Sequence, residues 1–283
     1  MELQLKNSLL LITAISLTIA SCEKDPDFIS PEHSADQRFN QSMEWNARHS
    51  YQEIVVQSDD YSILFMGDSH VGSTKNLDNF FNIAKNTKAS AVVMAGDLTT
   101  GEAKNYDVLE KCIPPRDSLL SFLTVGNHDL WSNSGWNEFF TRFGPSCYLF
   151  TVESPEATDL FISLDTGSGT LGAEQLAWFE DVLQNQRPAY RRCIVFTHNN
   201  FFRFRHTETV NPPVEELNKM IELFTRHHVD MLVAGHDHKR DAVLFGITTY
   251  VVMEPCKDGT DNAGYLSLRV KNGDVKYSFE NFD

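Results

Sequence analysis

Short apolar runs alternate with segments of helical periodicity over most of this chain of 283 residues. Several apolar runs end in Gly followed by Asp, Asn or His, as expected where a buried strand gives way to a polar loop. Strands are predicted within 61–68, 89–97, 119–129, 147–153, 158–166, 191–198 and 229–238, and helices within 76–88, 106–113, 136–144, 172–185 and 213–228. The alternation predicts one α/β domain over residues 51–283, with a central sheet covered by helices and shorter antiparallel strands within 241–255 and 263–280.

The N-terminal segment is predicted to be a targeting segment rather than part of this fold. The apolar run 9–20 is too short to span a bilayer as a helix, but it suits the core of a signal peptide. It leads into IASC, which resembles the bacterial lipobox and makes Cys22 the expected site of lipidation; a cleaved signal with a chance cysteine is the alternative. Residues 1–21 are therefore predicted to be a lipoprotein signal peptide and 22–50 a flexible tether. We expect a protein anchored by lipid to a membrane of the bacterial cell envelope, either periplasmic or surface-exposed.

The net negative charge of the chain makes an extended nucleic acid an unfavourable partner. The chain has 24 Lys and Arg against 39 Asp and Glu, a formal net charge of −15. Because such a chain repels phosphate backbones, we expect no extended nucleic-acid surface, and a small anionic substrate would need a local positive centre such as a metal. Cys147 and Cys193 lie in apolar runs and are expected to be buried side chains rather than disulfide partners. The sequence leaves the oligomeric state open.

Side chains that can ligate a metal follow five of the predicted strands. In an open α/β sheet the ends of the strands border the ligand crevice, so these five clusters can converge on one place. Taken singly, each cluster could be an ordinary turn or loop, but all five at strand ends indicate a common site. The residues are Asp68 and His70 in GDSH, Asp97 in AGDLTTG, Asn127 and His128 in GNHD, His198 in FTHNN, and His236 and His238 in GHDH.

The types of ligand indicate the cofactor. Carboxylates together with neutral imidazoles suit divalent transition metals such as manganese, iron or zinc. One ion does not readily use seven protein ligands, whereas two ions that share a carboxylate do. Asp97 is the expected bridge, because an apolar strand delivers its charge into the interior and two cations would compensate its burial.

Taken together, these motifs resemble the calcineurin-like metallophosphoesterase superfamily, whose pattern is D-x-H, G-D, G-N-H-[DE], H and G-H-x-H. The likeness covers residues 61–238. It implies a four-layer α-β-β-α sandwich with two mixed sheets. It also implies that Asp97 bridges two metal ions, one held by Asp68, His70 and His238 and the other by Asn127, His198 and His236.

Three departures from branches of this superfamily refine the expectation. Thr100 stands where purple acid phosphatases have a tyrosine, so a tyrosinate-bound ferric centre is not expected. Leu98 and Asp129 stand where protein phosphatases carry arginines, which argues against that activity. Thr197 precedes His198 where the family often has glycine, and this change leaves the ligand itself intact.

His128 and two arginines are the candidates for roles beyond metal binding. His128 lies beside a ligand and is the expected proton donor to the leaving group, with a structural histidine as the alternative. Asp129 is expected to orient His128. In NNFFRFRH, Arg203 or Arg205 would meet a second phosphate or carboxylate of the substrate; the alternative is packing phenylalanines beside solvated arginines.

The predicted function is hydrolysis of a small phosphoester, either a monoester or a diester, with two divalent metal ions and outside the cytoplasm. The alternative is a catalytically inactive, membrane-tethered binding lipoprotein of the same fold. Such a protein is expected to lack a ligand or His128, and this sequence lacks neither.

Overall fold

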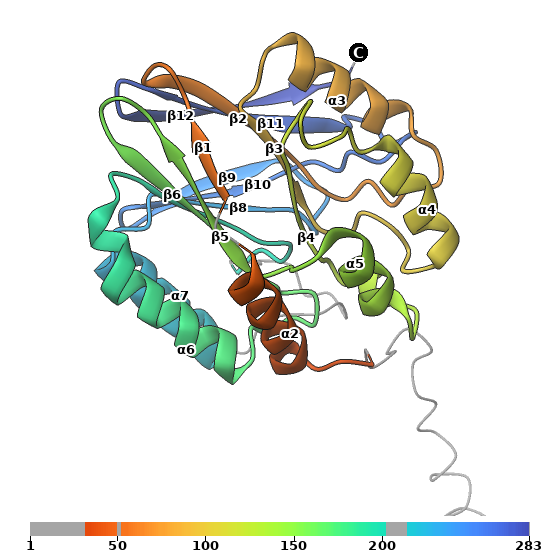
Figure 1. Cartoon of the computed structure of the whole chain (residues 1–283), viewed down its shortest axis with the longest axis horizontal. Helices are drawn as coiled ribbons and strands as arrows, with labels where there is room; N and C mark the ends of the chain where they lie inside the picture. The colour runs from red at the N-terminus through yellow and green to blue at the C-terminus, as the bar shows by residue number, and fades with distance from the viewer. Residues whose placement is uncertain (1–31, 50–51, 202–213, 283) are drawn as a thin grey trace, which may run out of the picture. The chain divides into compact units, whose positions relative to one another are not determined.

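Two mixed β-sheets stacked face to face form the centre of the computed structural model, which describes residues 32–49, 52–201 and 214–282 (Figure 1). The strands are β1 (Gln52–Val55), β2 (Asp60–Met66), β3 (Ala91–Ala95), β4 (Ser121–Thr124), β5 (Tyr148–Glu153), β6 (Thr158–Ser163), β7 (Cys193–Phe196), β8 (Met231–Ala234), β9 (Asp241–Phe245), β10 (Thr248–Val252), β11 (Gly264–Lys271) and β12 (Asp274–Asn281). One sheet has the order β1-β5-β6-β7-β8-β10-β9, and the other has the order β12-β11-β2-β3-β4. Strands β6, β7, β8 and β10 are parallel to one another in the first sheet, as are β2, β3 and β4 in the second.

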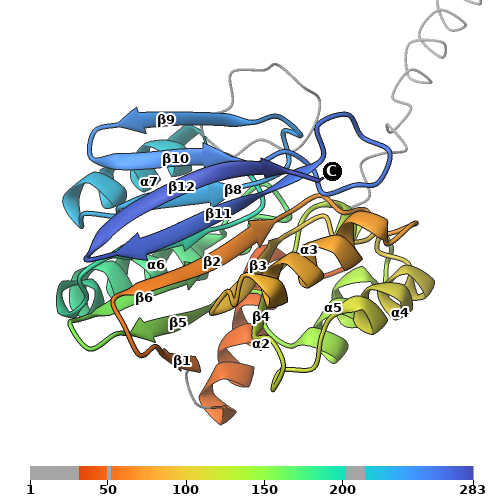
Figure 2. The same ribbon diagram turned by 90° about the horizontal axis from the view of Figure 1, so that it is seen from above.

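Helices cover the outer face of each sheet. Five of them are α3 (Lys75–Asn86), α4 (Ala103–Cys112), α5 (Gly135–Phe143), α6 (Ala173–Asp181) and α7 (Val214–Arg226). Helices α3, α4 and α5 lie along the five-stranded sheet, while α6 and α7 lie along the seven-stranded sheet (Figures 1 and 2). The predicted four-layer α-β-β-α sandwich with two mixed sheets is confirmed.

The two-residue period of a strand explains why the central strands are apolar throughout. In β3, Val93 packs between the two sheets, whereas Val92 and Met94 pack under the helices. In β7, Ile194 packs between the sheets and Val195 packs under α6 and α7. A strand that is buried on both faces therefore reads as a continuous apolar run.

The expected flexible tether over 22–50 is wrong in its second half, where the chain forms helix α2 (Ala35–Arg48). The helix begins with a capping box: the Ser34 hydroxyl accepts the Gln37 N–H, and the Gln37 side chain accepts the Ser34 N–H. The sequence Ser-x-x-Gln ahead of a helical segment is the signal that could have revealed it.

Helix α2 belongs to the domain because it packs through buried polar contacts. Arg38 is fully buried and donates two hydrogen bonds, of 2.8 and 2.9 Å, to the buried carboxylate of Asp165. The Asn46 amide donates to the Cys147 carbonyl at 2.9 Å, and the Phe39 ring packs against Trp178. These contacts join α2 to β5, to α6 and to the loop that follows β6.

Two smaller expectations concern the cysteines and the chain's last strands. Cys147 and Cys193 are buried, as predicted, and both are free; burial raises the pKa of the Cys193 thiol to about 12. The C-terminal strands form the antiparallel pairs β9–β10 and β11–β12. Strand β1, which the sequence pattern did not indicate, pairs in parallel with β5.

Candidate metal centre

The side chains predicted to bind metal lie in the loops that follow five strands. Strands β2, β3 and β4 belong to one sheet, and β7 and β8 belong to the other. The stacking of the two sheets brings the carboxyl ends of these strands to one place, as expected for an α/β ligand site. Three overlapping groups of ligand atoms, each within 4.8 Å, result: Asp68 with His70 and His238, His70 with Asp97 and His128, and Asp97 with His198 and His236.

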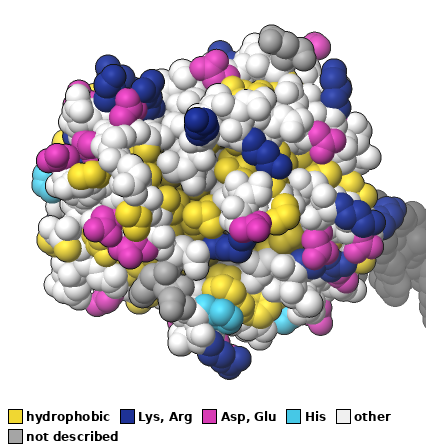
Figure 3. Space-filling model, turned by 45° about the horizontal axis from the view of Figure 1, so that its top comes forward, with side chains coloured by type: hydrophobic (Ala, Val, Ile, Leu, Met, Phe, Trp, Pro, Cys, Tyr) yellow, Lys and Arg dark blue, Asp and Glu magenta, His cyan; other side chains and the backbone are white. Residues whose placement is uncertain are grey.

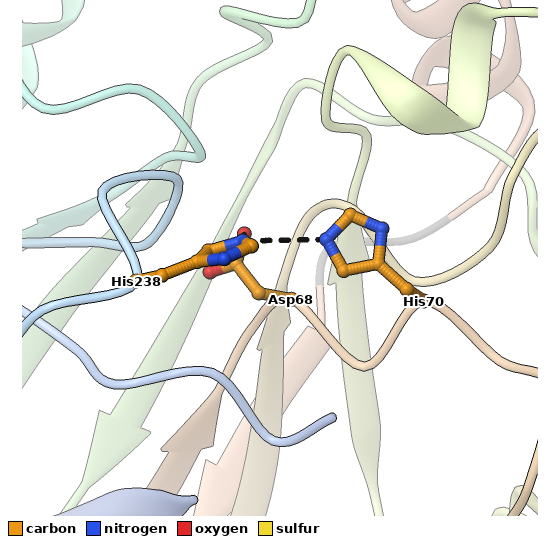
Figure 4. Close-up of side chains that lie close together, drawn as sticks. All are labelled: Asp68, His70 and His238. Atoms are coloured by element: carbon orange, nitrogen blue, oxygen red, sulfur yellow. Dashed lines mark hydrogen bonds and ion pairs between the residues drawn. The ribbon is translucent and has the colours of Figure 1, made fainter. Parts of the chain in front are cut away.

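The first group joins Asp68, His70 and His238. Nε2 of His238 lies 3.1 Å from Oδ1 of Asp68 and 3.3 Å from Nε2 of His70. Figure 4 shows the His70 ring directed toward His238 and Asp68, which lie beside each other. Three atoms with lone pairs thus face a common point, as ligands of one ion would.

The second group surrounds Nε2 of His198. This nitrogen lies 3.2 Å from Oδ2 of Asp97, 3.2 Å from Oδ1 of Asn127 and 3.0 Å from Nδ1 of His236. One proton on Nε2 can satisfy only one of these acceptors, whereas a metal ion accepts a lone pair from every one of them. The donor set therefore fits a divalent cation.

Asp97 lies between the two groups. Its Oδ2 is 3.2 Å from Nε2 of His198 and 3.8 Å from Nε2 of His70, a ligand atom of the other group. Its Oδ1 accepts the backbone N–H of His128 at 2.8 Å, which fixes the carboxylate. This position between two ligand groups is the one that a bridging carboxylate requires.

Backbone groups orient the ligands. Nδ1 of His198 lies 3.0 Å from the Ala95 carbonyl oxygen, so it donates its proton there and leaves Nε2 to face the site. The Asp68 carboxylate accepts the N–H of His236 at 2.9 Å, which ties the β2 and β8 loops together. Partners of this kind hold metal ligands in one tautomer and orientation.

Strained backbone is concentrated in these loops. Five of the predicted ligands have a left-handed backbone, with φ of 54° at Asp68, 40° at His70, 51° at Asp97, 70° at His236 and 50° at His238. Residues other than glycine adopt this conformation at a cost of about 1 kcal/mol or more each, and it persists where the surrounding structure imposes it. Its concentration at one cluster is typical of a functional site.

Close approach explains two glycines of the motifs. A Cβ atom on Gly126 would lie 2.1 Å from Oδ1 of Asp97, and one on Gly235 would lie 2.5 Å from Oδ2 of Asp68. Each glycine precedes one ligand and leaves room for the carboxylate of another. The G-N-H and G-H motifs are thus packing requirements of the centre as well as turns.

The buried charge of Asp97 favours a cation in the site. Burial acts to raise the pKa of Asp97, but His198, His128 and His70 hold it well below its usual range. Burial opposes the charged form of His198, yet the Asp97 carboxylate raises the pKa of His198 to about 9. Burial lowers the pKa of His70 to about 4, so its imidazole is neutral and free to ligate at pH 7. Without a metal, a proton on His198 compensates the Asp97 charge, and metal binding would release it.

His128 lies at the edge of the centre. Its Nε2 is 3.9 Å from Oδ2 of Asp97, and its ring packs 3.9 Å from the Trp131 ring, centroid to centroid. Its side chain is 26% exposed, so a substrate can reach it. Its Nδ1 has no hydrogen-bond partner among the described residues. Burial lowers the pKa of His128, so its imidazolium is a stronger acid but is the minor form at neutral pH.

The expectation that Asp129 orients His128 is wrong. The carboxylate of Asp129 is fully buried and accepts the backbone N–H groups of Leu98, Thr99 and Gly126 at 3.2, 2.8 and 2.9 Å. Burial and the neighbouring Asp97 charge raise the pKa of Asp129 to about 7. Asp129 therefore joins the β3 and β4 loops, which carry Asp97 and Asn127, instead of holding the His128 ring.

The family model described as calcineurin-like phosphoesterase matches residues 61–240, which is more than half of the sequence. The chain belongs to this family. With its cluster of ligands, this membership supports a metal-dependent phosphoesterase. A search of curated proteins by sequence gave no match.

Solved structures agree with the fold. GAP50, described as the anchor in the inner membrane complex of Plasmodium, is similar with a TM-score of 0.64 and 13% identity, covering 79% of this chain and 85% of its own. A dimetal phosphatase from Danio rerio is similar with a TM-score of 0.59 and 11% identity, covering 78% of this chain and 96% of its own. At these identities the likeness establishes the architecture alone.

Some predicted residues fall outside the described parts of the chain. These are Cys22, Arg203 and Arg205, together with the predicted signal peptide 1–21. Within the described residues, no helix is both long and apolar enough to cross a membrane. No metal-ligand motif marks the loop after β6 in the sequence, although its glycine-rich DTGSG follows a predicted strand as the ligand loops do.

Proposed function

We propose that this protein is a two-metal-dependent hydrolase of small phosphoesters, either monoesters or diesters. The observation that carries the proposal is the position of Asp97 between two groups of ligand atoms, in a chain of the calcineurin-like phosphoesterase family. Asp68, His70 and His238 would hold one ion, and Asn127, His198 and His236 the other. Manganese, iron and zinc suit this set of carboxylate, amide and imidazole ligands.

The chain's own residues supply positioning and a proton. When bound, two divalent cations provide a nucleophile at neutral pH and positive charge opposite the phosphoryl oxygens. His128 is near the ligands and partly exposed, so it would give a proton to the departing ester oxygen. Asp97 accepts the backbone N–H of His128, which holds the backbone that carries this donor.

The expected substrate is small. On the face drawn in Figure 3, Lys and Arg side chains lie scattered among Asp and Glu side chains and apolar areas. With the net charge of −15, this distribution favours a compact phosphoester over a long nucleic acid.

Hydrolysis of p-nitrophenyl phosphate and of bis(p-nitrophenyl) phosphate tests the proposal. We expect turnover of at least one of them by protein loaded with Mn²⁺, and its loss when EDTA removes the metal. Recovery on adding Mn²⁺ back would control for unfolding. Since one solved neighbour is described as an anchor, the alternative of a binding lipoprotein is tested in the same assay. Hydrolysis of neither ester with manganese, iron or zinc would favour the binding protein.

Replacing His128 with alanine is expected to slow turnover by roughly 10²–10⁴-fold, the usual contribution of general acid catalysis, without loss of bound metal. The loss should be largest for esters with poor leaving groups, because these need the proton most. The measurement is kcat for a series of aryl phosphates, with metal content determined in parallel. A variant that loses metal would instead identify His128 as a ligand, a role its place beside His70 and Asp97 also permits.

The proposed location is outside the cytoplasm, with a lipid anchor at Cys22. Its support is the short apolar run and the IASC sequence at the N-terminus. Incorporation of a labelled fatty acid that is lost in Cys22→Ser would support it, and equal labelling of the variant would contradict it.

A further inference from the structure

The two chain neighbours of His198 are both bonded to one threonine. Thr166 lies in the loop after β6, and Thr166, Thr197 and Asn199 are all fully buried. The Thr166 hydroxyl accepts the N–H of Asn199 at 2.8 Å and lies 2.7 Å from the hydroxyl of Thr197. The Thr166 carbonyl accepts the side-chain amide of Asn199 at 2.9 Å. Three hydrogen bonds thus converge on a residue that is itself no metal ligand.

The hydroxyl protons of this network have one consistent arrangement. Thr197 donates to the Leu164 carbonyl at 2.9 Å, so its oxygen is free to accept from Thr166. Thr166 in turn accepts from the Asn199 N–H. Both hydroxyl protons are thus satisfied. Oδ1 of Asn199 is the one polar atom of these three side chains without a hydrogen-bond partner among the described residues.

The network begins where the sheet ends. The β6–β7 ladder stops at the pair Ser163 and Phe196, and one more backbone bond joins Leu164 to Phe196 at 3.0 Å. Beyond that point the other neighbouring strand, β8, still holds the His198 carbonyl through the N–H of Gly235 at 3.0 Å. On the β6 side, Thr166 takes the place of the missing backbone ladder.

We propose that Thr166 is a positioning residue for the metal centre, which fixes His198 through its neighbours Thr197 and Asn199. This inference rests on the proposed function only in taking His198 as a metal ligand. It also gives Thr197 a role, because its hydroxyl links Thr166 to the Leu164 carbonyl. The loop is itself anchored, since Arg38 and the N–H of Gly167 hold the Asp165 carboxylate.

Metal affinity is the readout that separates positioning from a purely structural role. Thr166→Val keeps the shape of the side chain and removes the hydroxyl. We expect it to weaken the binding of one of two Mn²⁺ ions by roughly 10–100-fold, the usual effect of losing an outer partner of a ligand. Thr166→Ser, which keeps the hydroxyl, should stay close to the wild-type affinity. Isothermal titration with Mn²⁺ measures this, and the absorption bands of Co²⁺-loaded protein report the changed ligand geometry.

Thr248→Val is the matched control. Thr248 is also buried and donates to the Val229 carbonyl at 2.8 Å, but it begins β10 at the end of the sheet away from the centre. We expect this variant to lose stability and keep its Mn²⁺ affinity. If Thr166→Val does not fold, Thr197→Val breaks the same network from the other side and should show the same loss.

Wild-type Mn²⁺ affinity and an unchanged Co²⁺ spectrum in a folded Thr166→Val or Thr197→Val variant would overturn the inference. The inference would also be overturned if Thr248→Val lost as much Mn²⁺ affinity as Thr166→Val. Wild-type protein that binds Mn²⁺ but hydrolyses no phosphoester would refute the proposed function, while the affinities of the variants would still decide the role of Thr166.

Discussion

Asp97→Asn is expected to lower turnover by at least about a hundredfold and to weaken metal binding at both positions. Losing an outer partner of a ligand commonly costs 10–100-fold, so losing the shared ligand should cost no less. The substitution keeps the shape of the side chain and the acceptor for the His128 N–H, but removes the charge that lies between His198 and His70. The measurement is kcat for p-nitrophenyl phosphate together with the number of Mn²⁺ ions bound per chain.

The charge of Asp97 also affects the pKa of His198. In metal-free protein, Asp97 raises the pKa of His198 to about 9 against the effect of burial, so Asp97→Asn should lower this pKa. An NMR titration of the His198 ring measures the change. If the pKa of His198 stayed near 9, another negative charge, such as that of Asp68, would be what raises it.

Asp230→Asn is the matched control for Asp97→Asn. Asp230 precedes β8 at the end opposite the centre, and its carboxylate accepts from Arg192 at 2.8 Å and from the Cys193 N–H at 2.9 Å. We expect the metal content and the turnover of Asp230→Asn to remain near those of the wild type. Loss of only one ion in Asp97→Asn would contradict the bridging role, as would retention of both ions with turnover within a fewfold of wild type.

Arg38→Met is expected to lower the free energy of unfolding by about 3–5 kcal/mol. The guanidinium of Arg38 is fully buried, and the Asp165 carboxylate is 1% exposed. Removing one partner leaves the other charge buried without compensation, which costs far more than loss of a surface ion pair. Chemical denaturation followed by circular dichroism measures the difference.

Two variants test the cause of this loss. Arg48→Ala, in the same helix, removes an exposed pair whose atoms lie 3.8 Å apart and should change stability by no more than about 1 kcal/mol. Adding Asp165→Asn to Arg38→Met removes the unpaired charge, while the amide oxygen can still accept the Gly167 N–H, so part of the stability should return. If Arg38→Met were as stable as the wild type, the buried pair of Arg38 and Asp165 would not be what holds α2 to the domain.

Much of the metal centre could be predicted from the sequence because its ligands lie in short motifs at strand ends. Gly126 and Gly235 are part of this signal, since each leaves space for a carboxylate from a different loop. The partners of these ligands carried no such pattern. Asp129 ends the GNHD motif, yet its buried carboxylate accepts backbone N–H groups of two loops, which no spacing in the sequence indicates.

Helix α2 shows a second limit. Its capping box at Ser34 and Gln37 is local and readable, but the burial of Arg38 is not, because arginine is almost never fully buried unless it is paired. The partner, Asp165, lies 127 positions further along the chain. Only the folded domain reveals that this pair exists.

The sequence by itself indicated most strands and helices of the sandwich, the family and the candidate ligands, because apolar period and motif spacing are local properties of the chain. The tertiary structure alone decided that α2 belongs to the domain and that Thr166 holds both neighbours of His198. These contacts join segments far apart in the sequence. They depend on how two sheets stack to bury their shared core, and that arrangement is a property of the whole chain rather than of any stretch of it.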